Sequence, residues 1–448
     1  MGRSRLLVAS VLLVTACVGG SYSPPSPTPT SPASPTPGAT AEPTPTATPS
    51  VGGIELARSG LSRATVDPAL ASQAADAMNA FGLDLYGRLA AAPDNIVLSP
   101  ASVAIALSMA RLGAVGQTAS ELDAVLRELG AEALADAANA LDAALAARTG
   151  TFADSAGEDQ DVLLRIVNAQ FVQFDMPLQA TFLDTMATRY GAGAWQVDYR
   201  NDPEAARQAI NAWVAENTEG RIPEILKPGI VTEAWRLAIA NAIYLKAAWL
   251  EPFFDEATAP GSFTLADGSV IQVPLMRGLK SAPYAVGDDW AAIQLPYVGR
   301  DLAMLVIVPN DLATFEASLD ASVFRSVVDS LRDGRVELTF PRFDFGSDFE
   351  LNDVLIAMGM PTAFKGTADF SGITTAAALK IAKVIHQANI TVDEAGTEAA
   401  AATIVGFDTS GGEMPMLRVD RPFLFAIRDV STGAIVFLGH VADPSATN

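Results

Sequence analysis

The chain has 448 residues, half of them hydrophobic, so it can form one large domain or about two to three ordinary ones. Its 29 basic and 51 acidic residues give a net charge of −22, which argues against nucleic acid as a partner because phosphates would be repelled. The single cysteine, Cys17, excludes a disulfide within the chain and a cysteine-based zinc site.

The first 17 residues have the layout of a secretory signal. A basic start at Arg3 and Arg5 precedes the apolar run Leu6–Val14, which is too short to cross a bilayer. The next residues, Val-Thr-Ala-Cys from Val14, resemble the bacterial lipobox, whose cysteine receives a diacylglyceryl group. An ordinary signal peptide with a chance cysteine is the alternative. We expect a lipoprotein signal peptide over residues 1–16, lipidation at Cys17, and export with lipid anchoring at the cell surface or envelope.

Residues 21–50 consist almost entirely of Pro, Thr, Ser and Ala. Such a segment cannot bury a core and prefers extended, polyproline-like states. We therefore expect residues 17–60 to form a disordered stalk. The folded domain is expected over residues 67–444.

Helical signals lead in the folded region. They are apolar residues at helical spacing, or an N-terminal cap before an apolar run. They predict helices around Met78–Leu89, from Ser99-Pro100 to Gly113, from a capping box at Thr118–Glu121, from Asp202-Pro203 to Gly220, and from a Ser347 cap to Gly359.

Strand signals dominate the second half. Apolar and β-branched runs predict strands at Val162–Phe174, Trp235–Leu245, Phe263–Leu265, Val270–Met276, Leu302–Val308, Val336–Phe345, Leu379–Val392 and within Pro422–Val441. Asp267-Gly268 predicts a hairpin turn. Because helices and strands do not alternate regularly, the pattern indicates an α+β fold.

The sequence shows no recognisable catalytic centre. It contains no H-E-x-x-H, G-x-S-x-G or phosphate-binding G-x-x-x-x-G-K-S/T motif, and so predicts no cofactor and no metal. The two histidines, His386 and His440, lie in apolar runs, where a hydrogen-bonded core residue is the common reading. The many carboxylates leave a hydrolase with a pair of catalytic carboxylates as an open alternative, although no particular pair stands out in the sequence.

Seven stretches carry a family resemblance. They are Asn95–Ala114, Ile210–Ile222, Asn241–Trp249, Leu295–Pro309, V-D-E-A-G-T-E-A-A-A-A-T at Val392–Thr403, D-R-P-F-L-F-A-I-R-D at Asp420–Asp429, and Phe437–Pro444. In this order they resemble segments of the serpins, a family of serine protease inhibitors. The resemblance covers Asp67–Pro444.

The resemblance implies a single α+β domain with three β-sheets, about eight or nine helices and an exposed reactive-centre loop. In this family a target protease attacks the loop as a substrate. After acylation the loop inserts as a new strand into the main sheet, and the trapped enzyme is deformed before it can deacylate. On this reading the loop here covers residues 394–419.

The hinge of this loop has a composition that suits insertion. Strand side chains alternate, so if Thr397 points inward, Ala399, Ala401, Thr403 and Val405 do too. All are small or of modest size, and larger ones would overpack the sheet at about 1–3 kcal/mol each. The predicted hinge consists of Glu394, Gly396, Thr397, Glu398, Ala399, Ala400, Ala401, Ala402 and Thr403, with Gly396 supplying backbone freedom. A flexible alanine-rich surface loop is the alternative.

The resemblance also assigns residues beneath the main sheet. Ser99, Ser102, Asn241 and His386 match a polar cluster located where strands part for the loop. His386 is therefore expected to have a structural role in sheet opening and no catalytic one.

Two further positions match the point where the loop inserts. Trp249 matches an aromatic residue there, and Arg342 matches the partner of Glu394 in a hinge ion pair. An exposed pair contributes only about 0–1 kcal/mol, but at a gate it can still bias opening.

The scissile bond is placed by counting. Counting forward from Glu394 puts the residue before it at Ser410, and counting back from Pro422 favours Gly411. The candidates Thr409, Ser410 and Gly411 are all small and uncharged.

These candidates favour an elastase-like or subtilisin-like serine protease as partner, with some cysteine proteases included. A trypsin-like enzyme would need Arg or Lys, and Arg418 is too far along. Phe407 or Met414 would suit a chymotrypsin-like enzyme only with an unusual loop length.

We expect a monomeric, irreversible suicide-substrate inhibitor of serine endopeptidases. The alternatives are a serpin-shaped surface binding protein that never inserts its loop, and a lipid-anchored enzyme. The small-residue hinge argues against the first alternative, and the lack of a nucleophile–base constellation argues against the second.

Overall fold

The computed structural model describes residues 53–90, 94–127, 130–397 and 414–446. The chain divides into two units, residues 1–44 and 45–448, and all described residues belong to the second. The predicted signal peptide, Cys17 and most of the predicted stalk therefore lie outside the described residues. The end of the predicted stalk is described, and there Glu55–Ala57 forms strand β1, which pairs with β5 Ala194–Val197 in place of the expected disorder. Among those described, no helix is long and apolar enough to cross a membrane.

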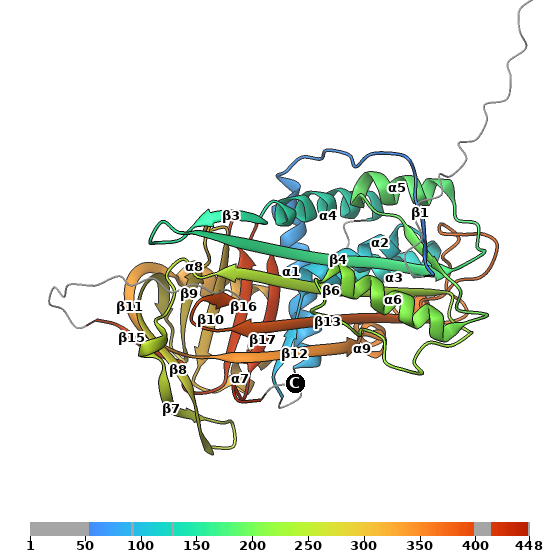
Figure 1. Cartoon of the computed structure of the whole chain (residues 1–448). Helices are drawn as coiled ribbons and strands as arrows, with labels where there is room; N and C mark the ends of the chain where they lie inside the picture. Colours follow the sequence, from blue (N-terminus) through green and yellow to red (C-terminus); the bar gives the residue numbers. More distant parts are fainter. Residues whose placement is uncertain (1–52, 91–93, 128–129, 398–413, 447–448) are drawn as a thin grey trace, which may run out of the picture. The chain divides into compact units, whose positions relative to one another are not determined.

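Helices occupy mainly the first half of the described chain (Figure 1). The α-helices are α1 Leu70–Leu89, α2 Pro100–Arg111, α3 Gly116–Val125, α4 Ala131–Ala146, α5 Ala180–Tyr190, α6 Pro203–Asn217, α7 Leu312–Ser318, α8 Ala321–Ser330 and α9 Asn352–Met358. There are also two short 3₁₀ helices among the described residues, η1 Asp255–Ala257 and η2 Thr362–Phe364.

Strands fill most of the second half. They are β1 Glu55–Ala57, β2 Ile96–Leu98, β3 Gly150–Ala153, β4 Asp159–Gln173, β5 Ala194–Val197, β6 Leu237–Ala248, β7 Ala259–Thr264, β8 Val270–Val286, β9 Trp290–Pro296, β10 Leu302–Pro309, β11 Arg332–Pro341, β12 Phe343–Glu350, β13 Lys383–Val392, β14 Gly396–Thr397, β15 Met416–Arg418, β16 Phe423–Asp429 and β17 Ile435–Val441. The α+β fold class is confirmed.

The described strands form two hydrogen-bonded sheets. The first has the order β1-β5-β4-β6-β13-β12, with β3 paired to β4 and β14 to β6. The second has the order β15-β11-β8-β9-β10-β16-β17-β2, with β7 paired to β8. The second sheet is continuous because the long strand β8 pairs with β7 and β11 along most of its length and with β9 at its end. The three sheets implied by the resemblance are thus joined into two.

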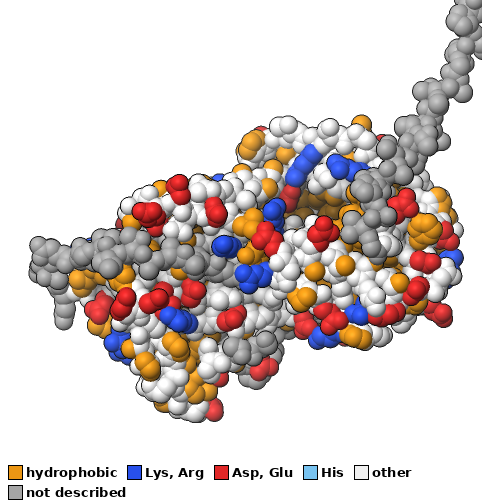
Figure 2. Space-filling view, in the orientation of Figure 1, with side chains coloured by type: hydrophobic (Ala, Val, Ile, Leu, Met, Phe, Trp, Pro, Cys, Tyr) orange, Lys and Arg blue, Asp and Glu red, His pale blue; other side chains and the backbone are white. Residues whose placement is uncertain are grey.

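Apolar cores cover both faces of the first sheet. Alternate residues of β4 and β6 contribute to a large core shared with α1, α2, α4, α5 and the second sheet. The intervening residues form a smaller core under α6, which lies across the near face of β6 in Figure 1. Strand β6 is therefore buried along nearly all of its length. Figure 2 shows that carboxylate side chains are scattered over the visible face.

Several local signals are confirmed. The Ser99 hydroxyl accepts a hydrogen bond from the Ser102 N–H at 3.2 Å and caps α2, which begins with Pro100. The Asp202 carboxylate accepts from the Ala205 N–H at 3.0 Å and caps α6. The turn at Asp267-Gly268 joins β7 and β8. Each signal acts through the backbone of its immediate neighbours, so distant contacts do not override it.

Two cap predictions are wrong. Helix α3 begins at Gly116, so Thr118 and Glu121 lie inside it. The Thr118 hydroxyl instead accepts from the Asp369 N–H, and Glu121 accepts from the N–H of Thr362. These side chains hold a distant segment, a use that short-range patterns do not distinguish from capping.

Ser347 does not cap a helix either. It lies in β12, and its hydroxyl accepts a hydrogen bond from the Val97 N–H at 3.1 Å. The predicted strand Val336–Phe345 is two strands, because the chain leaves the second sheet after Pro341 and enters the first at Phe343. A continuous apolar run carries no sign of such a change of sheet.

Candidate functional site

A buried polar cluster lies beneath the junction of β6 and β13. Ser99, Ser102, Asn241 and His386 are all fully buried. The Asn241 side-chain amide donates to the Ser102 hydroxyl at 2.5 Å, and the Asn241 carbonyl bonds to His386 Nδ1. The structure thus brings together the four residues that the resemblance assigned to sheet opening.

The hydrogen bonds define the protonation of His386. Its Nε2 accepts the Ser99 backbone N–H at 2.9 Å, so the ring proton lies on Nδ1 and is donated to Asn241. The Phe349 ring stacks on the imidazole at a centroid distance of 6.4 Å. Burial lowers the pKa of His386 to about 3, so the ring is neutral at physiological pH.

A fifth member of this polar cluster is Asn168 on β4. Its side-chain carbonyl accepts from the Asn241 amide, and the Ser102 hydroxyl donates to it at 3.4 Å. Strand pairing places Asn168 directly opposite Asn241. Sequence reasoning missed Asn168, although an asparagine inside the apolar run of β4 could have signalled it.

The main sheet is only partly closed between β6 and β13. These strands pair in parallel over Ala238–Ile243 and Lys383–Ala388. Further along β6, Ala247 and Ala248 pair with the two-residue strand β14 instead, in an antiparallel sense. We call the line between β6 and β13 the seam. At its open end the seam already holds the first residues of the hinge.

Thr397 is directed into the protein at this point. It is 2% exposed, and its hydroxyl lies 2.8 Å from the Tyr297 hydroxyl. Tyr297 in turn stacks on Trp249 at 4.6 Å, with an interplanar angle of 10°. The inward orientation that alternation requires for the hinge is therefore present at its first inserted position.

Gly396 is required by close approach. A Cβ atom there would lie 2.2 Å from the Ala247 carbonyl oxygen and 2.7 Å from the Ala248 Cα. Both contacts are with backbone, which cannot move aside without disturbing β6. The sequence predicted that Gly396 supplies backbone freedom at a pivot. The structure adds a steric reason, because there is no room for a side chain at this position.

The turn before β14 is tied to the chain that follows β6. The backbone N–H of Trp249 donates to the Ala395 carbonyl at 2.9 Å, and its indole N–H donates to the Asp393 carbonyl at 3.0 Å. The N–H of Phe253 donates to the Glu394 carbonyl at 2.8 Å. Trp249 therefore lies beside the first hinge residues and holds them through two hydrogen bonds.

A second set of contacts holds the hinge through side chains. The Glu394 carboxylate pairs with Arg342, whose Nε lies 2.7 Å and Nη2 2.5 Å away, and it also accepts from the Thr258 hydroxyl. The Asp393 carboxylate accepts from the N–H groups of Ala395 and Gly396, and burial raises the pKa of Asp393. The ion pair implied by the resemblance is thus present.

The remaining predicted loop residues lie outside the described residues. These are Glu398, Ala399, Ala400, Ala401, Ala402 and Thr403 of the hinge, and Thr409, Ser410 and Gly411 at the scissile bond. The described chain resumes before β15, which pairs in parallel with β11 at the edge of the second sheet. Across the described ranges, no group of three or more His, Cys, Asp or Glu side chains could hold a metal ion.

Comparison with known proteins identifies the family. The sequence profile described as "Serpin (serine protease inhibitor)" matches residues 76–444. The chain is 36% identical over 375 residues to an uncharacterised serpin-like protein of Thermococcus kodakarensis, covering 82% of this chain and 85% of that protein. It is 31% identical over 388 residues to the leukocyte elastase inhibitor of Homo sapiens, covering 83% of this chain and all of that one. The chain belongs to the serpin family, so it is related to protease inhibitors such as this last protein and not to enzymes.

Solved structures support the fold. The native state of tengpin, a thermophilic serpin, has a TM-score of 0.75 at 23% identity and covers 86% of this chain and 96% of its own. A complex of thyroxine-binding globulin with thyroxine has a TM-score of 0.73 at 26% identity and covers 84% of this chain. The fold thus occurs in proteins with different functions, so the fold alone does not establish what this chain does. The argument for a function has to come from the hinge.

Proposed function

We propose that this serpin is an irreversible suicide-substrate inhibitor of serine endopeptidases. The observation that carries the proposal is β14: Gly396 and Thr397 already lie as a strand against β6, with the Thr397 side chain buried. A hinge that never inserts has no need of a small residue and a buried hydroxyl at this position. The non-inhibitory alternative lacks such a supporting observation.

Continuing the β14–β6 register predicts the inserted state. Since Thr397 lies opposite Ala247, each further loop residue pairs one position earlier in β6. Ala399 and Ala401 would then face the large core, and Thr403 would lie opposite Asn241. A hydroxyl at Thr403 would give Asn241 a new hydrogen-bond partner when His386 moves away with β13.

The free energy of insertion supports a trap. Parting the seam breaks a parallel ladder of six residue pairs, and an inserted strand makes two antiparallel ladders. A net gain of about ten hydrogen bonds at about 0.5–1.5 kcal/mol each gives about 5–15 kcal/mol. This equals the stability of a typical domain, so the uninserted form must be held kinetically. The free energy released by insertion is large enough to distort a protease tethered to the loop. A shift of about 1 Å in the catalytic groups of such an enzyme lowers its reaction rate about a hundredfold.

The proposed targets are elastase-like or subtilisin-like proteases. The support is the small, uncharged sequence Thr409-Ser410-Gly411 and the similarity to proteins named leukocyte elastase inhibitor. We further propose that Cys17 carries a lipid that holds the inhibitor at the cell surface or envelope, on the sequence evidence of residues 1–17.

The test is incubation with a panel of purified elastase-like, subtilisin-like and trypsin-like proteases. We expect a denaturant-resistant covalent adduct with a member of the first two classes, and a released C-terminal peptide whose first residue, read by mass spectrometry, is Ser410 or Gly411 or the glycine after it. The nicked chain should also melt at a higher temperature than the intact one. Cleavage without adduct and without this rise would refute the proposal.

A further inference from the structure

A lysine side chain is buried beneath the chain that follows β6. Lys280 on β8 is 3% exposed. Its amine donates to the carbonyls of Glu251 and Pro252 at 2.5 and 2.9 Å, and it lies 3.5 Å from the centre of the Phe253 ring. We call residues 251–253 the support segment. All three of its contacts with the amine are through electron-rich acceptors, which suits the three N–H groups of an ammonium.

The support segment holds the hinge. The Phe253 N–H donates to the Glu394 carbonyl at 2.8 Å, and Phe253 itself is 2% exposed. Strand β8 leaves room for this arrangement at Gly278, where a Cβ atom would lie 3.3 Å from the Phe253 ring and 3.4 Å from Lys280 Cε. Lys280 therefore acts on the hinge through Phe253.

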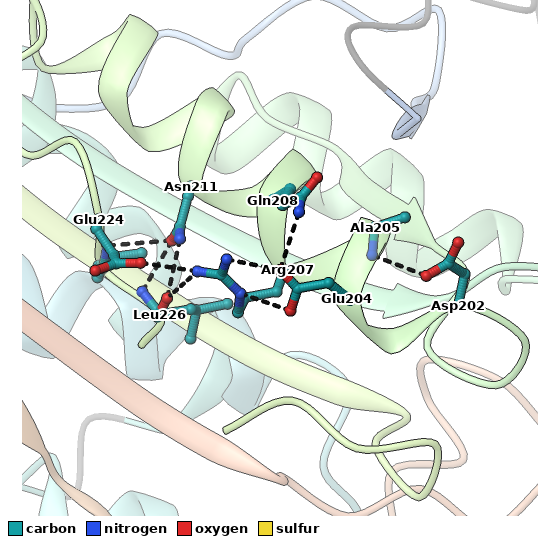
Figure 3. Close-up of polar contacts among 9 residues, drawn as sticks. Asp202, Glu204, Ala205, Arg207, Gln208, Asn211, Glu224 and Leu226 are labelled. Carbon is teal, nitrogen blue, oxygen red and sulfur yellow. Dashed lines mark hydrogen bonds and ion pairs between the residues drawn. The ribbon is translucent and has the colours of Figure 1, made fainter. Parts of the chain in front are cut away.

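Another buried cation shows what the site of Lys280 lacks. Arg207 on α6 is 8% exposed, makes a bidentate pair with Glu204 at 2.7 and 2.9 Å, and reaches Glu224 at 2.9 Å (Figure 3). Two carboxylates thus compensate its charge. The acceptors around Lys280 are carbonyls and an aromatic ring, which carry no net charge, so its ammonium is solvated less well than in water.

Little else near Lys280 compensates its charge. The cavity beside the amine is about 10 Å³, which is too small for a hydrated anion. Glu251 is the ionisable residue among the described ones that line it with Lys280, and its carboxylate accepts the Ser281 N–H at 3.0 Å. The neighbours from β9 are Leu295 and Pro296, and the residue paired with Lys280 on β11 is Val336. Burial lowers the pKa of Lys280 to about 7, and the charge of Glu251 opposes this shift.

We propose that Lys280 is a positioning residue of the hinge, and that protonation of its amine weakens the hold of the support segment on the hinge. This rests on the proposed function. When the support segment detaches, the amine meets water, where a lysine has a pKa of about 10.4. Between about pH 7 and 10.4 the detached state therefore binds a proton that the attached state does not, so detachment becomes harder as the pH rises. Below about pH 7 both states are protonated, and the dependence on pH ends.

The experiment measures hydrogen exchange of the Phe253 amide in the intact full chain, resolved by mass spectrometry and corrected for the intrinsic exchange rate. Between pH 7.0 and 8.5 the protection of this amide in wild type should rise, by about 15-fold at most. Lys280→Met keeps an unbranched side chain against the Phe253 ring but does not titrate, so its protection should stay constant. The matched control is Lys365→Met at an exposed lysine, which should keep the wild-type rise.

A second variant tests the assignment without touching Lys280. Glu251→Gln keeps an acceptor for the Ser281 N–H but removes the charge that raises the pKa of Lys280. The pH at which protection begins to rise should therefore move below the wild-type value. Equal rises in wild type and Lys280→Met, or no such move in Glu251→Gln, would overturn the role of Lys280 and leave the proposed function intact. A chain with the expected rise that forms no adduct with any protease and gains no stability after nicking would instead overturn the proposed function.

Discussion

The buried imidazole of His386 predicts an acid sensitivity of defined size. Its Nε2 accepts the Ser99 N–H, so a proton added there would face a donor, and burial disfavours the charged ring. Burial lowers the pKa of His386 to about 3 in the folded state, whereas a histidine in an unfolded chain has a pKa of about 6.5. Between these values the unfolded chain binds a proton that the folded chain does not.

The sign and the magnitude follow from this difference. The free energy of unfolding falls as the pH falls through the window from about 6.5 to about 3. Each pH unit within the window lowers it by about 1.4 kcal/mol, so at pH 4.5 the loss from this group is about 3 kcal/mol relative to pH 7.5. Below about pH 3 the loss stops growing because both states are protonated.

The assay compares wild type with His386→Gln in urea unfolding followed by tryptophan fluorescence at pH 7.5 and 4.5. Glutamine supplies one donor and one acceptor but does not titrate in this range. Carboxylates contribute equally to both proteins, so the difference between their pH dependences reports His386. We expect wild type to lose about 3 kcal/mol more than the variant. Equal losses in the two proteins would refute the assignment of a neutral, buried His386.

Three further predictions concern the hinge. Thr397→Arg places a charge at a buried position, so loop insertion should fail and the target protease should cleave without forming an adduct on denaturing gels. Gly396→Ala places a methyl group against the Ala247 carbonyl, so β14 should detach and hydrogen exchange at the end of β6 should speed up. Arg342→Gln removes the ion pair of the hinge, so a fluorescein-labelled synthetic peptide with the sequence of residues 397–408 should anneal to the intact chain faster, as measured by fluorescence anisotropy.

Two of the three hinge predictions have a matched control variant. Thr397→Ser keeps the hydroxyl near Tyr297 and should still form the adduct, and adduct formation by Thr397→Arg would contradict the inward orientation. Gly87→Ala adds a methyl group in α1 that meets no atom within 4 Å, so it should leave exchange in β6 unchanged; equal exchange in both glycine variants would argue against the close approach. An Arg342→Gln rate equal to wild type would show that the pair does not restrain the hinge.

The candidate site was only partly predictable from its own residues. Alternation predicted which hinge residues share a face with Thr397, because a strand exposes alternate residues to opposite faces. That Thr397 itself is buried is seen in the structure. Asn168 could not be assigned in this way. Its role depends on β4 lying antiparallel to β6, so that it meets Asn241 across about 70 residues of chain.

The predicted helix caps also separate into those that depend on near neighbours and those that depend on distant segments. Ser99 and Asp202 cap α2 and α6 as predicted, because a cap acts on N–H groups two or three residues away. Thr118 and Ser347 have the same chemistry but bond to Asp369 and Val97, segments that only the folded chain brings near.

By itself, the amino-acid sequence determined several of the helices and strands, the caps of α2 and α6 and the small-residue character of the hinge, because these depend on interactions between near neighbours and on side-chain size. The tertiary structure alone decided where the seam opens and which residues span it. The pairing of β6 with β13 ends at Ile243, β14 begins at Gly396, and Lys227 meets Asp348 across the seam. These are long-range pairings, and their free energy is available only when the whole sheet has assembled.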